Sequence, residues 1–171
     1  HDHKNYIGCI GVYGSRAANF VIQNSDFVLS LGSRLDTRVT GGVPKNFARQ
    51  AIIAAVDIDK YELNKKRGLK IEIKINESLK DFFIVFRKTA KNTIILKTEW
   101  VKKSILWKKK YPIVLDVNRK QKKYVNPYFF MERLSKYLKN DDIVIADDGA
   151  HLTWTIQALK VLKKQRLFSA F

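Results

Sequence analysis

The sequence has one cysteine, Cys9, and only 3 prolines. It also has no apolar run near the ~20 residues that a membrane-spanning helix needs, and no signal peptide is visible at its start. A single cysteine cannot form an internal disulfide, which excludes a disulfide-stapled secreted domain. These absences predict a soluble globular protein of a reducing compartment, and we expect a cytoplasmic location with no membrane partner.

Acidic residues are also scarce, with 16 Asp and Glu against 33 Lys and Arg, for a formal net charge of +17. The lysines are spread along the chain, with clusters at Lys65–Arg67, Lys108–Lys110 and Lys120–Lys123. This pattern is typical of solvated faces. A basic nucleic-acid-binding domain is the further alternative, because a field of this size attracts polyanions. The aromatic residues interleaved with lysines that would serve it are Trp100, Trp107, Tyr111 and Tyr124.

The 171 residues open with "HDHKNYIG" and end with the apolar "RLFSAF", so we interpret the chain as an internal piece of a longer one. Apolar strand-like runs alternate with helical patterns from residue 7 to about 90. This alternation predicts an α/β fold with a parallel, doubly wound, Rossmann-like sheet. We expect a truncated central domain over 1–90, a linker with one amphipathic helix over 91–125, and the first β-α unit of a second, truncated α/β domain over 126–171.

Within 1–90, Ser15 is expected to cap a helix, and strands are expected in "FVLSLG", "AIIAAVDID" and "LKIEIKI". Asp59 and Glu62 have the spacing of a capping box, and "ESLKDFFIVFRKTA" has the pattern of an amphipathic helix. Residues 7–14 are expected to form an apolar, strand-like segment. Residues 33–42 are expected to form a loop. Further on, "TEWVKKSILWKKKYP" predicts a helix, "DVNRKQKKY" a loop, and Asn126–Pro127 a helix start. A strand "IVIA", a helix over 152–163 and a last strand "RLFSAF" complete the prediction.

Polar and glycine-rich turns follow several of these elements, where parallel sheets bind their ligands. The turn Gly11–Arg16 allows close approach of backbone to a phosphate, although an ordinary tight turn has similar residues. Arg34 and Arg38 suit bidentate contacts with phosphate or carboxylate. Asp36 would accept a hydrogen bond from a ribose hydroxyl or hold Arg38 in place. The structural alternative is that these residues form a buried salt bridge within the loop. Asp57 suits a ribose at a strand end.

A further turn, "DDGAH", places Asp147, Asp148, Gly149 and His151 at a helix start. A helix start favours anions because its N–H groups are free. The histidine has a structural reading as well, as an exposed or satisfied imidazole. We find no zinc-ligand spacing, paired catalytic carboxylates or nucleophile elbow.

Taken together, "GVYGSRAANFVIQNSDFVLSLGSRLDTRVTGG" and "AAVDIDKYEL" resemble the central domain of thiamine-diphosphate enzymes of the acetolactate synthase group. "NPYFFMERLSKYL", "DDIVIADDGAH" and "RLFSAF" resemble the linker and the opening of the pyrophosphate-binding domain in the same group. The resemblance covers nearly the whole chain, and it implies an FAD-type nucleotide across the central domain. By matched position, the nucleotide would contact Gly11, Val12, Tyr13, Gly32, Arg34, Asp36, Arg38, Val39, Asp57, Ile58 and Glu62. The residues expected at the thiamine diphosphate are Asp148, Gly149, Ala150 and His151.

Four departures from the group pattern, Tyr13, Thr37, Ala150 and the pair Ile75–Asn76, leave FAD, another adenine nucleotide and an empty groove as alternatives. The resemblance implies a parent enzyme with thiamine diphosphate and Mg²⁺ that decarboxylates a 2-oxo acid such as pyruvate and transfers the two-carbon unit. It also implies a homodimer or homotetramer. The group's catalytic glutamate and magnesium motif are not in this sequence, so we expect no catalytic or metal residue here and no activity of this piece alone. A non-catalytic dinucleotide-binding module is the main alternative.

Overall fold

The computed structural model describes residues 3–90, 98–162 and 164–169. The chain forms two compact units, one over Phe20–Trp100 and the other over His1–Asn19 together with Val101–Phe171. The two divisions fall inside the helices α1 (Arg16–Gln23) and α5 (Thr98–Lys110). The predicted domain boundaries at 90 and 125 stay a prediction, and residues 91–97 of the predicted linker lie outside the described residues.

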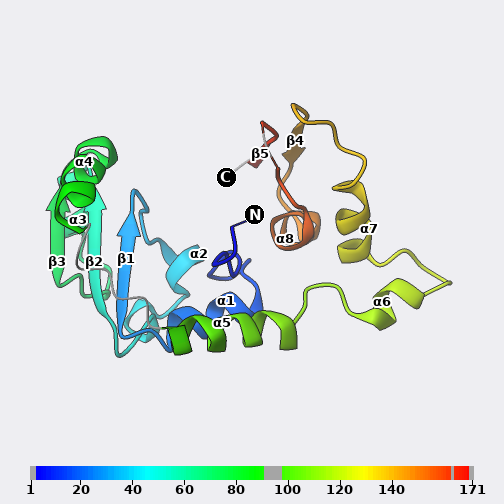
Figure 1. The fold of residues 1–171 in the computed structure, drawn as a ribbon, viewed down its shortest axis with the longest axis horizontal. Coiled ribbons are helices and arrows are strands. Elements are labelled where there is room, and N and C mark those ends of the chain that lie inside the picture. Colours follow the sequence, from blue (N-terminus) through cyan, green and yellow to red (C-terminus); the bar gives the residue numbers. More distant parts are fainter. Residues whose placement is uncertain (1–2, 91–97, 163, 170–171) are drawn as a thin grey trace. The chain divides into compact units, whose positions relative to one another are not determined.

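The Phe20–Trp100 unit contains a parallel sheet of β1 (Phe27–Leu31), β2 (Ile52–Asp57) and β3 (Ile73–Asn76), in the order β1-β2-β3 (Figure 1). The register aligns Leu31 of β1 with Val56 of β2, and Asp57 of β2 with Asn76 of β3. All three strands therefore end at the same edge. The predicted parallel α/β fold is confirmed.

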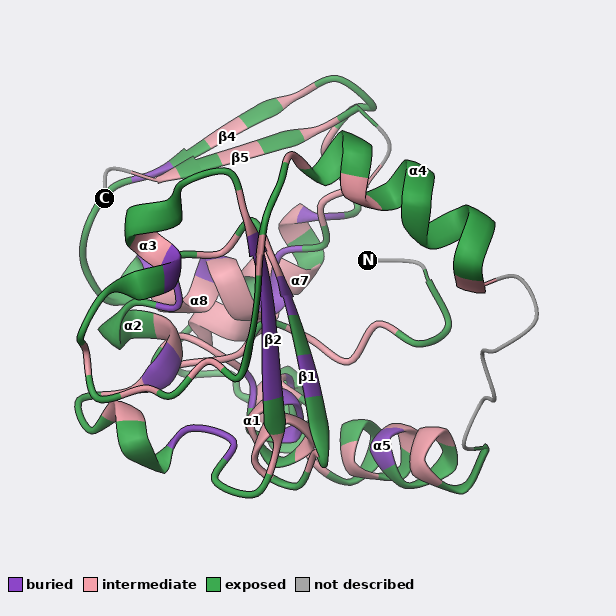
Figure 2. Ribbon diagram, turned by 90° about the vertical axis from the view of Figure 1, so that its left-hand side faces the viewer, coloured by how far each residue is buried: buried purple, intermediate pink, exposed green. Residues whose placement is uncertain are grey.

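The core of this unit is centred on β2, where four consecutive residues from Ile53 to Val56 are buried. A run of this kind is typical of a strand covered on both faces. β1 differs, because Val28 and Ser30 are buried while the alternating Phe27 and Leu29 are exposed. Figure 2 shows the same contrast along the two strands.

Helices connect the strands of this sheet, and one more helix follows the last strand. They are α2 (Thr37–Thr40), the 3-10 helix η1 (Pro44–Asn46), α3 (Lys60–Asn64) and α4 (Leu79–Ala90). The expected loop over 33–42 thus contains a short helix, because the Asp36 side chain accepts hydrogen bonds from its first amides. The predicted helix over α4 is confirmed, and none of its residues is buried (Figure 2).

In the other unit, α6 (Asp116–Lys120), α7 (Pro127–Leu134) and α8 (Ala150–Ala158) accompany a parallel pair of strands, β4 (Ile143–Ala146) and β5 (Arg166–Ser169). The cap at Asn126 is confirmed, since its side chain accepts from the Phe129 N–H at 3.1 Å. Ser15 also caps as predicted, because its hydroxyl accepts from the Ala18 N–H at 3.2 Å.

Three sequence predictions in this unit are wrong. Residues 7–14 form no strand: residues 7–10 have no regular secondary structure, and residues 11–14 form a turn in which the Gly14 N–H donates to the Gly11 carbonyl at 3.0 Å. Residues 116–120 are helical rather than looped, since the Asn118 side chain accepts from the Leu115 N–H at 2.8 Å and closes the first turn. The last helix ends at Ala158 instead of continuing to residue 163.

Candidate functional site

The loop after β1 begins where the sheet ladder is still intact. The Gly32 N–H donates to the Val56 carbonyl at 2.8 Å, so the chain leaves the sheet only after this residue. Gly32 has φ +58°, and a Cβ there would lie 3.1 Å from the Leu79 side chain. Both the backbone angle and the close approach favour glycine at this position. The loop 33–39 consequently starts from a fixed point at the carboxyl edge of the sheet.

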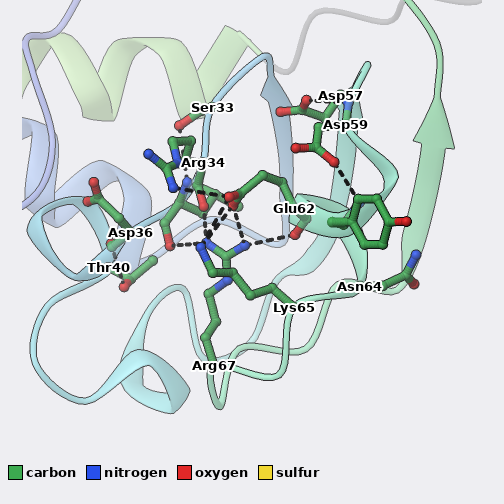
Figure 3. A network of polar contacts seen from close by, with 12 residues as sticks. Ser33, Arg34, Asp36, Thr40, Asp57, Asp59, Glu62, Asn64, Lys65 and Arg67 are labelled. Atoms are coloured by element: carbon green, nitrogen blue, oxygen red, sulfur yellow. Dashed lines mark hydrogen bonds and ion pairs between the residues drawn. The ribbon is translucent and has the colours of Figure 1, made fainter.

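An ion-pair cluster joins this loop to α3 (Figure 3). The Glu62 Oε1 atom lies 3.2 Å from Arg34 Nη2 and 3.1 Å from Lys65 Nζ, and Oε2 lies 2.9 Å from Arg67 Nη2. The hydrogen bond from Lys65, followed by the contributions of Arg67 and Arg34, lowers the pKa of Glu62 below its usual value. One carboxylate therefore faces three cations, and the cluster keeps a net positive charge that suits an anionic ligand.

The guanidinium of Arg67 is the most enclosed cation of this cluster. Its side chain is 14% exposed, whereas that of Arg34 is 70% exposed. Arg67 donates to the carbonyl oxygens of Arg34, Leu35 and Glu62 and to the Glu62 carboxylate. Sequence reasoning missed Arg67 as a site residue, because it stands in the run "KKR", which has the composition of a solvated face.

Two predicted carboxylates of this edge serve the backbone. Asp36 caps α2, since its Oδ1 accepts from the Arg38 N–H at 2.9 Å and the Val39 N–H at 3.2 Å. The Asp57 Oδ1 atom accepts from the Asp59 N–H at 2.9 Å. Figure 3 shows Asp57 and Asp59 apart from the Glu62 cluster. A carboxylate has lone pairs left after such bonds, so neither contact prevents ligand binding.

The third strand end adds an amide that was noted in the sequence only as a departure from the family pattern. The Asn76 Nδ2 atom donates to the carbonyl oxygens of Asp57 at 3.0 Å and Ile58 at 2.8 Å. This clamp fixes the chain as it leaves β2, where Ile58 is 76% exposed. Asp59 caps α3 as predicted, through the Tyr61 N–H at 2.8 Å. Glu62 does not act as the expected return partner of that box, because its oxygens bond to the three cations.

The structure thus brings together a set of the predicted nucleotide residues on the loops that leave one sheet edge. They are Gly32, Arg34, Asp36, Arg38, Val39, Asp57, Ile58 and Glu62. Gly11, Val12 and Tyr13 belong to the other compact unit, so their place beside this edge stays a prediction.

The turn at Gly11 has its own clamp. The Gly11 N–H donates to Asn19 Oδ1 at 2.8 Å, and Asn19 Nδ2 donates back to the Gly11 carbonyl at 2.9 Å. Gly11 has φ +93°, and Gly14 has no room for a Cβ, which would lie 2.5 Å from the Ile10 carbonyl carbon. Sequence reasoning missed Asn19, although its place in "RAAN" was a usable signal.

The second predicted cofactor turn lies between β4 and α8. Gly149 has φ +140°, and a Cβ there would approach the His151 Cε1 atom to 2.9 Å. The carboxylates of Asp147 and Asp148 each accept from the next amide, at 2.8 and 3.0 Å. The first amides of α8, at Ala150 and His151, have no carbonyl partner within the helix. A turn of this shape fits a diphosphate, which such amides bind well.

A cavity of about 340 Å³ lies in the same unit. Its lining includes Tyr6, Cys9, Tyr111, Glu132 and Gln157, and it contains none of the predicted cofactor residues. Among the described residues, no group of three or more His, Cys, Asp or Glu side chains could hold a metal ion. No described helix has the length and apolar composition to cross a membrane.

Comparison with known proteins defines the class first. Residues 1–83 match the family model described as thiamine pyrophosphate enzyme, central domain. This part of the chain, with its parallel α/β sheet and loops at the carboxyl edge, is similar to the central domain of thiamine pyrophosphate enzymes.

Within that class the chain is similar to acetolactate synthase large subunits. It is 31% identical to the one from Lactococcus lactis over 91% of this chain and 26% of the relative. It is 31% identical to the one from Cyanidium caldarium over 96% of this chain and 28% of the relative. The large subunit from Porphyra purpurea is 28% identical over 99% of this chain. The predicted resemblance is confirmed, and the chain spans about a quarter of the length of these relatives.

Proposed function

We propose that this chain serves a thiamine-diphosphate-dependent enzyme that decarboxylates a 2-oxo acid such as pyruvate and joins the two-carbon unit to an acceptor carbonyl. The similarity to acetolactate synthase large subunits over most of the chain supports this proposal. The bound thiamine diphosphate would supply the carbanion chemistry. The residues of this chain would bind and orient cofactors. In this proposal Mg²⁺ accompanies the thiamine diphosphate, and the parent protein is a homodimer or homotetramer.

The observation that carries the nucleotide part of the proposal is the exposed Arg34 at the carboxyl edge of the sheet. It is held by Glu62, at a place where parallel α/β sheets bind nucleotides. A guanidinium there forms bidentate contacts with a diphosphate. The exposed Ile58, directly after the neighbouring strand β2, adds apolar surface to this edge. We propose FAD as the nucleotide, with a structural role rather than electron transfer.

The Gly149 turn would hold the diphosphate of thiamine. The amides of Ala150 and His151 would donate to it, and the His151 imidazole would lie beside it. Here glycine is needed because of its φ and because a side chain would meet the imidazole. The chain's own contribution is position and charge, with no proton transfer assigned to it.

An absorption spectrum of the purified full-length enzyme tests the nucleotide assignment. We expect flavin bands that persist through gel filtration and release FAD on denaturation. A colourless protein that binds no added FAD would overturn the FAD assignment. Pyruvate consumption with thiamine diphosphate and Mg²⁺ tests the reaction. Flavin without any pyruvate turnover would instead favour the non-catalytic nucleotide-binding module.

A further inference from the structure

Arg67 connects two segments that are far apart in the sequence. Its Nη1 atom donates to the Arg34 carbonyl and, at 3.2 Å, to the Leu35 carbonyl. Its Nη2 atom donates to the Glu62 carbonyl at 2.7 Å and to Glu62 Oε2 at 2.9 Å. One guanidinium therefore binds the loop 33–39 on one side and α3 on the other (Figure 3).

The two loop carbonyls that Arg67 binds are the ones on either side of the Leu35 Cα atom. Leu35 has φ +47°, in the left-handed region that a leucine rarely adopts, and it is 4% exposed. A strained backbone of this kind persists only where its surroundings hold it. The geometry indicates that Arg67 is one of the groups that hold it.

The same guanidinium also acts on a side chain. Arg67 binds Glu62 through Oε2, and Glu62 binds the exposed Arg34 through Oε1 at 3.2 Å. The enclosed cation thus orients the carboxylate, which orients the exposed cation. A lysine could not replace it, because an ammonium on a flexible stem lacks the planar fork that reaches several acceptors at once.

We propose that Arg67 is a positioning residue of the nucleotide site, which fixes the loop 33–39 and presents Arg34 to the phosphates of a bound adenine dinucleotide. This inference rests on the proposed function for the identity of the ligand. Its structural half, the hold on the loop, does not depend on any ligand.

The test compares Arg67→Lys and Arg67→Met with Arg49→Met in the full-length protein. Arg49 is an exposed arginine of the same unit, and its side chain makes no hydrogen bond or ion pair with another described residue. Amide hydrogen exchange without nucleotide reports on the loop, and titration with FAD reports on the site. We expect faster exchange over residues 35–41 in both Arg67 variants. We also expect roughly tenfold weaker FAD binding, the loss typical of a charged hydrogen-bond network.

Arg34→Met, alone and combined with Arg67→Lys, separates positioning from general stability. If Arg67 acts through Arg34, the effect of Arg67→Lys on FAD affinity shrinks in the Arg34→Met background, because coupled residues are not additive. A merely structural Arg67 would weaken FAD binding equally in both backgrounds, and that result would overturn the proposal.

The outcomes also separate this inference from the proposed function. Wild-type protein that binds no FAD would contradict the FAD assignment, while faster loop exchange in the Arg67 variants would still support the hold on the loop. Wild-type protein that binds FAD, with Arg67→Lys matching Arg49→Met in exchange and affinity, would overturn the role of Arg67 alone.

Discussion

The two candidate sites both follow a parallel strand, but they are built from different materials. At the carboxyl ends of β1 and β2, the site is formed by side chains, since Glu62 forms ion pairs with Arg34, Lys65 and Arg67. At the end of β4, the backbone does, through Gly149 and the first amides of α8. The first site would bind a ligand through charged side chains, and the second through backbone amides held in a glycine turn.

This difference teaches how each site should respond to substitution. In a network of several ion pairs the partners are coupled, and removing one of them leaves the remaining contacts in place. A turn that depends on one glycine conformation has no second contact to compensate for a substitution, because any side chain strains the backbone at φ +140°. We therefore expect the largest single effect at Gly149.

Gly149→Ala should destabilise the folded state by about 1–3 kcal/mol, the cost of a residue held in a sparsely populated backbone region. Thiamine diphosphate binding should weaken with it, because the amides of Ala150 and His151 would move. Urea unfolding and cofactor titration of the full-length protein measure the two effects. The matched control is Gly42→Ala, since a Cβ at Gly42 would meet nothing within 4 Å.

Adding His151→Ala to Gly149→Ala identifies the cause. The new Cβ would lie 2.9 Å from the imidazole, and an imidazole can rotate away. If backbone strain dominates, as we expect, removing the imidazole restores little stability. Equal stability of Gly149→Ala and Gly42→Ala would show that the turn does not need glycine.

The sequence was sufficient for features that depend on near neighbours. The buried run of β2, the caps at Ser15, Asp59 and Asn126, and the parallel class were all predicted and are confirmed. Each of these depends on local chemistry or on an apolar pattern within one element. The motifs around Gly11, Arg34 and Asp57 also predicted the resemblance to thiamine pyrophosphate enzymes, which the family match confirms.

What could not be predicted depends on contacts across the chain. Arg67 looks like one more basic residue in a lysine run, and only the fold brings it to the carbonyls of Arg34 and Leu35. Glu62 has the spacing of a capping partner for Asp59, but its carboxylate bonds instead to three nearby cations, which lower its pKa. The spacing of residues in the sequence does not show whether a side chain bonds to a near neighbour or to a residue that only the fold brings close.

Asp36 sharpens the comparison, because it serves both the backbone and the proposed site. Asp36→Ala should cost about 1 kcal/mol through loss of the α2 cap, whereas Asp36→Asn should keep most of the cap. If Asp36 also binds the nucleotide, Asp36→Asn should weaken FAD binding while leaving the urea midpoint nearly unchanged. Thr37→Ala, a neighbouring exposed position, is the control. Equal FAD affinity of Asp36→Asn and wild type would limit Asp36 to capping.

The smallest expected effect concerns a carboxylate in the unit that holds Gly149. Glu132 of α7 is bonded to Arg119 of α6 through both of its oxygens, with Nη2 to Oε2 at 2.7 Å. The hydrogen bond from Arg119 lowers the pKa of Glu132 in the folded state below the usual value of about 4.5. The stability that this pair adds is therefore present above about pH 4.5 and is lost as the pH falls through the lower, folded-state value.

Glu132→Gln should accordingly be less stable than wild type at neutral pH, by less than about 1 kcal/mol for a partly exposed pair. The gap should close as the pH falls through the lowered, folded-state pKa of Glu132, because wild type then loses the same contribution. Urea unfolding over this range measures it, with Glu77→Gln as the control, an exposed glutamate that forms no ion pair among the described residues. A gap that stays constant with pH would mean that the glutamine disturbs packing rather than charge.

Glu62→Gln should show the same direction of pH dependence, but only Glu62→Gln should also weaken FAD binding, because only that carboxylate orients a cation of the proposed nucleotide site.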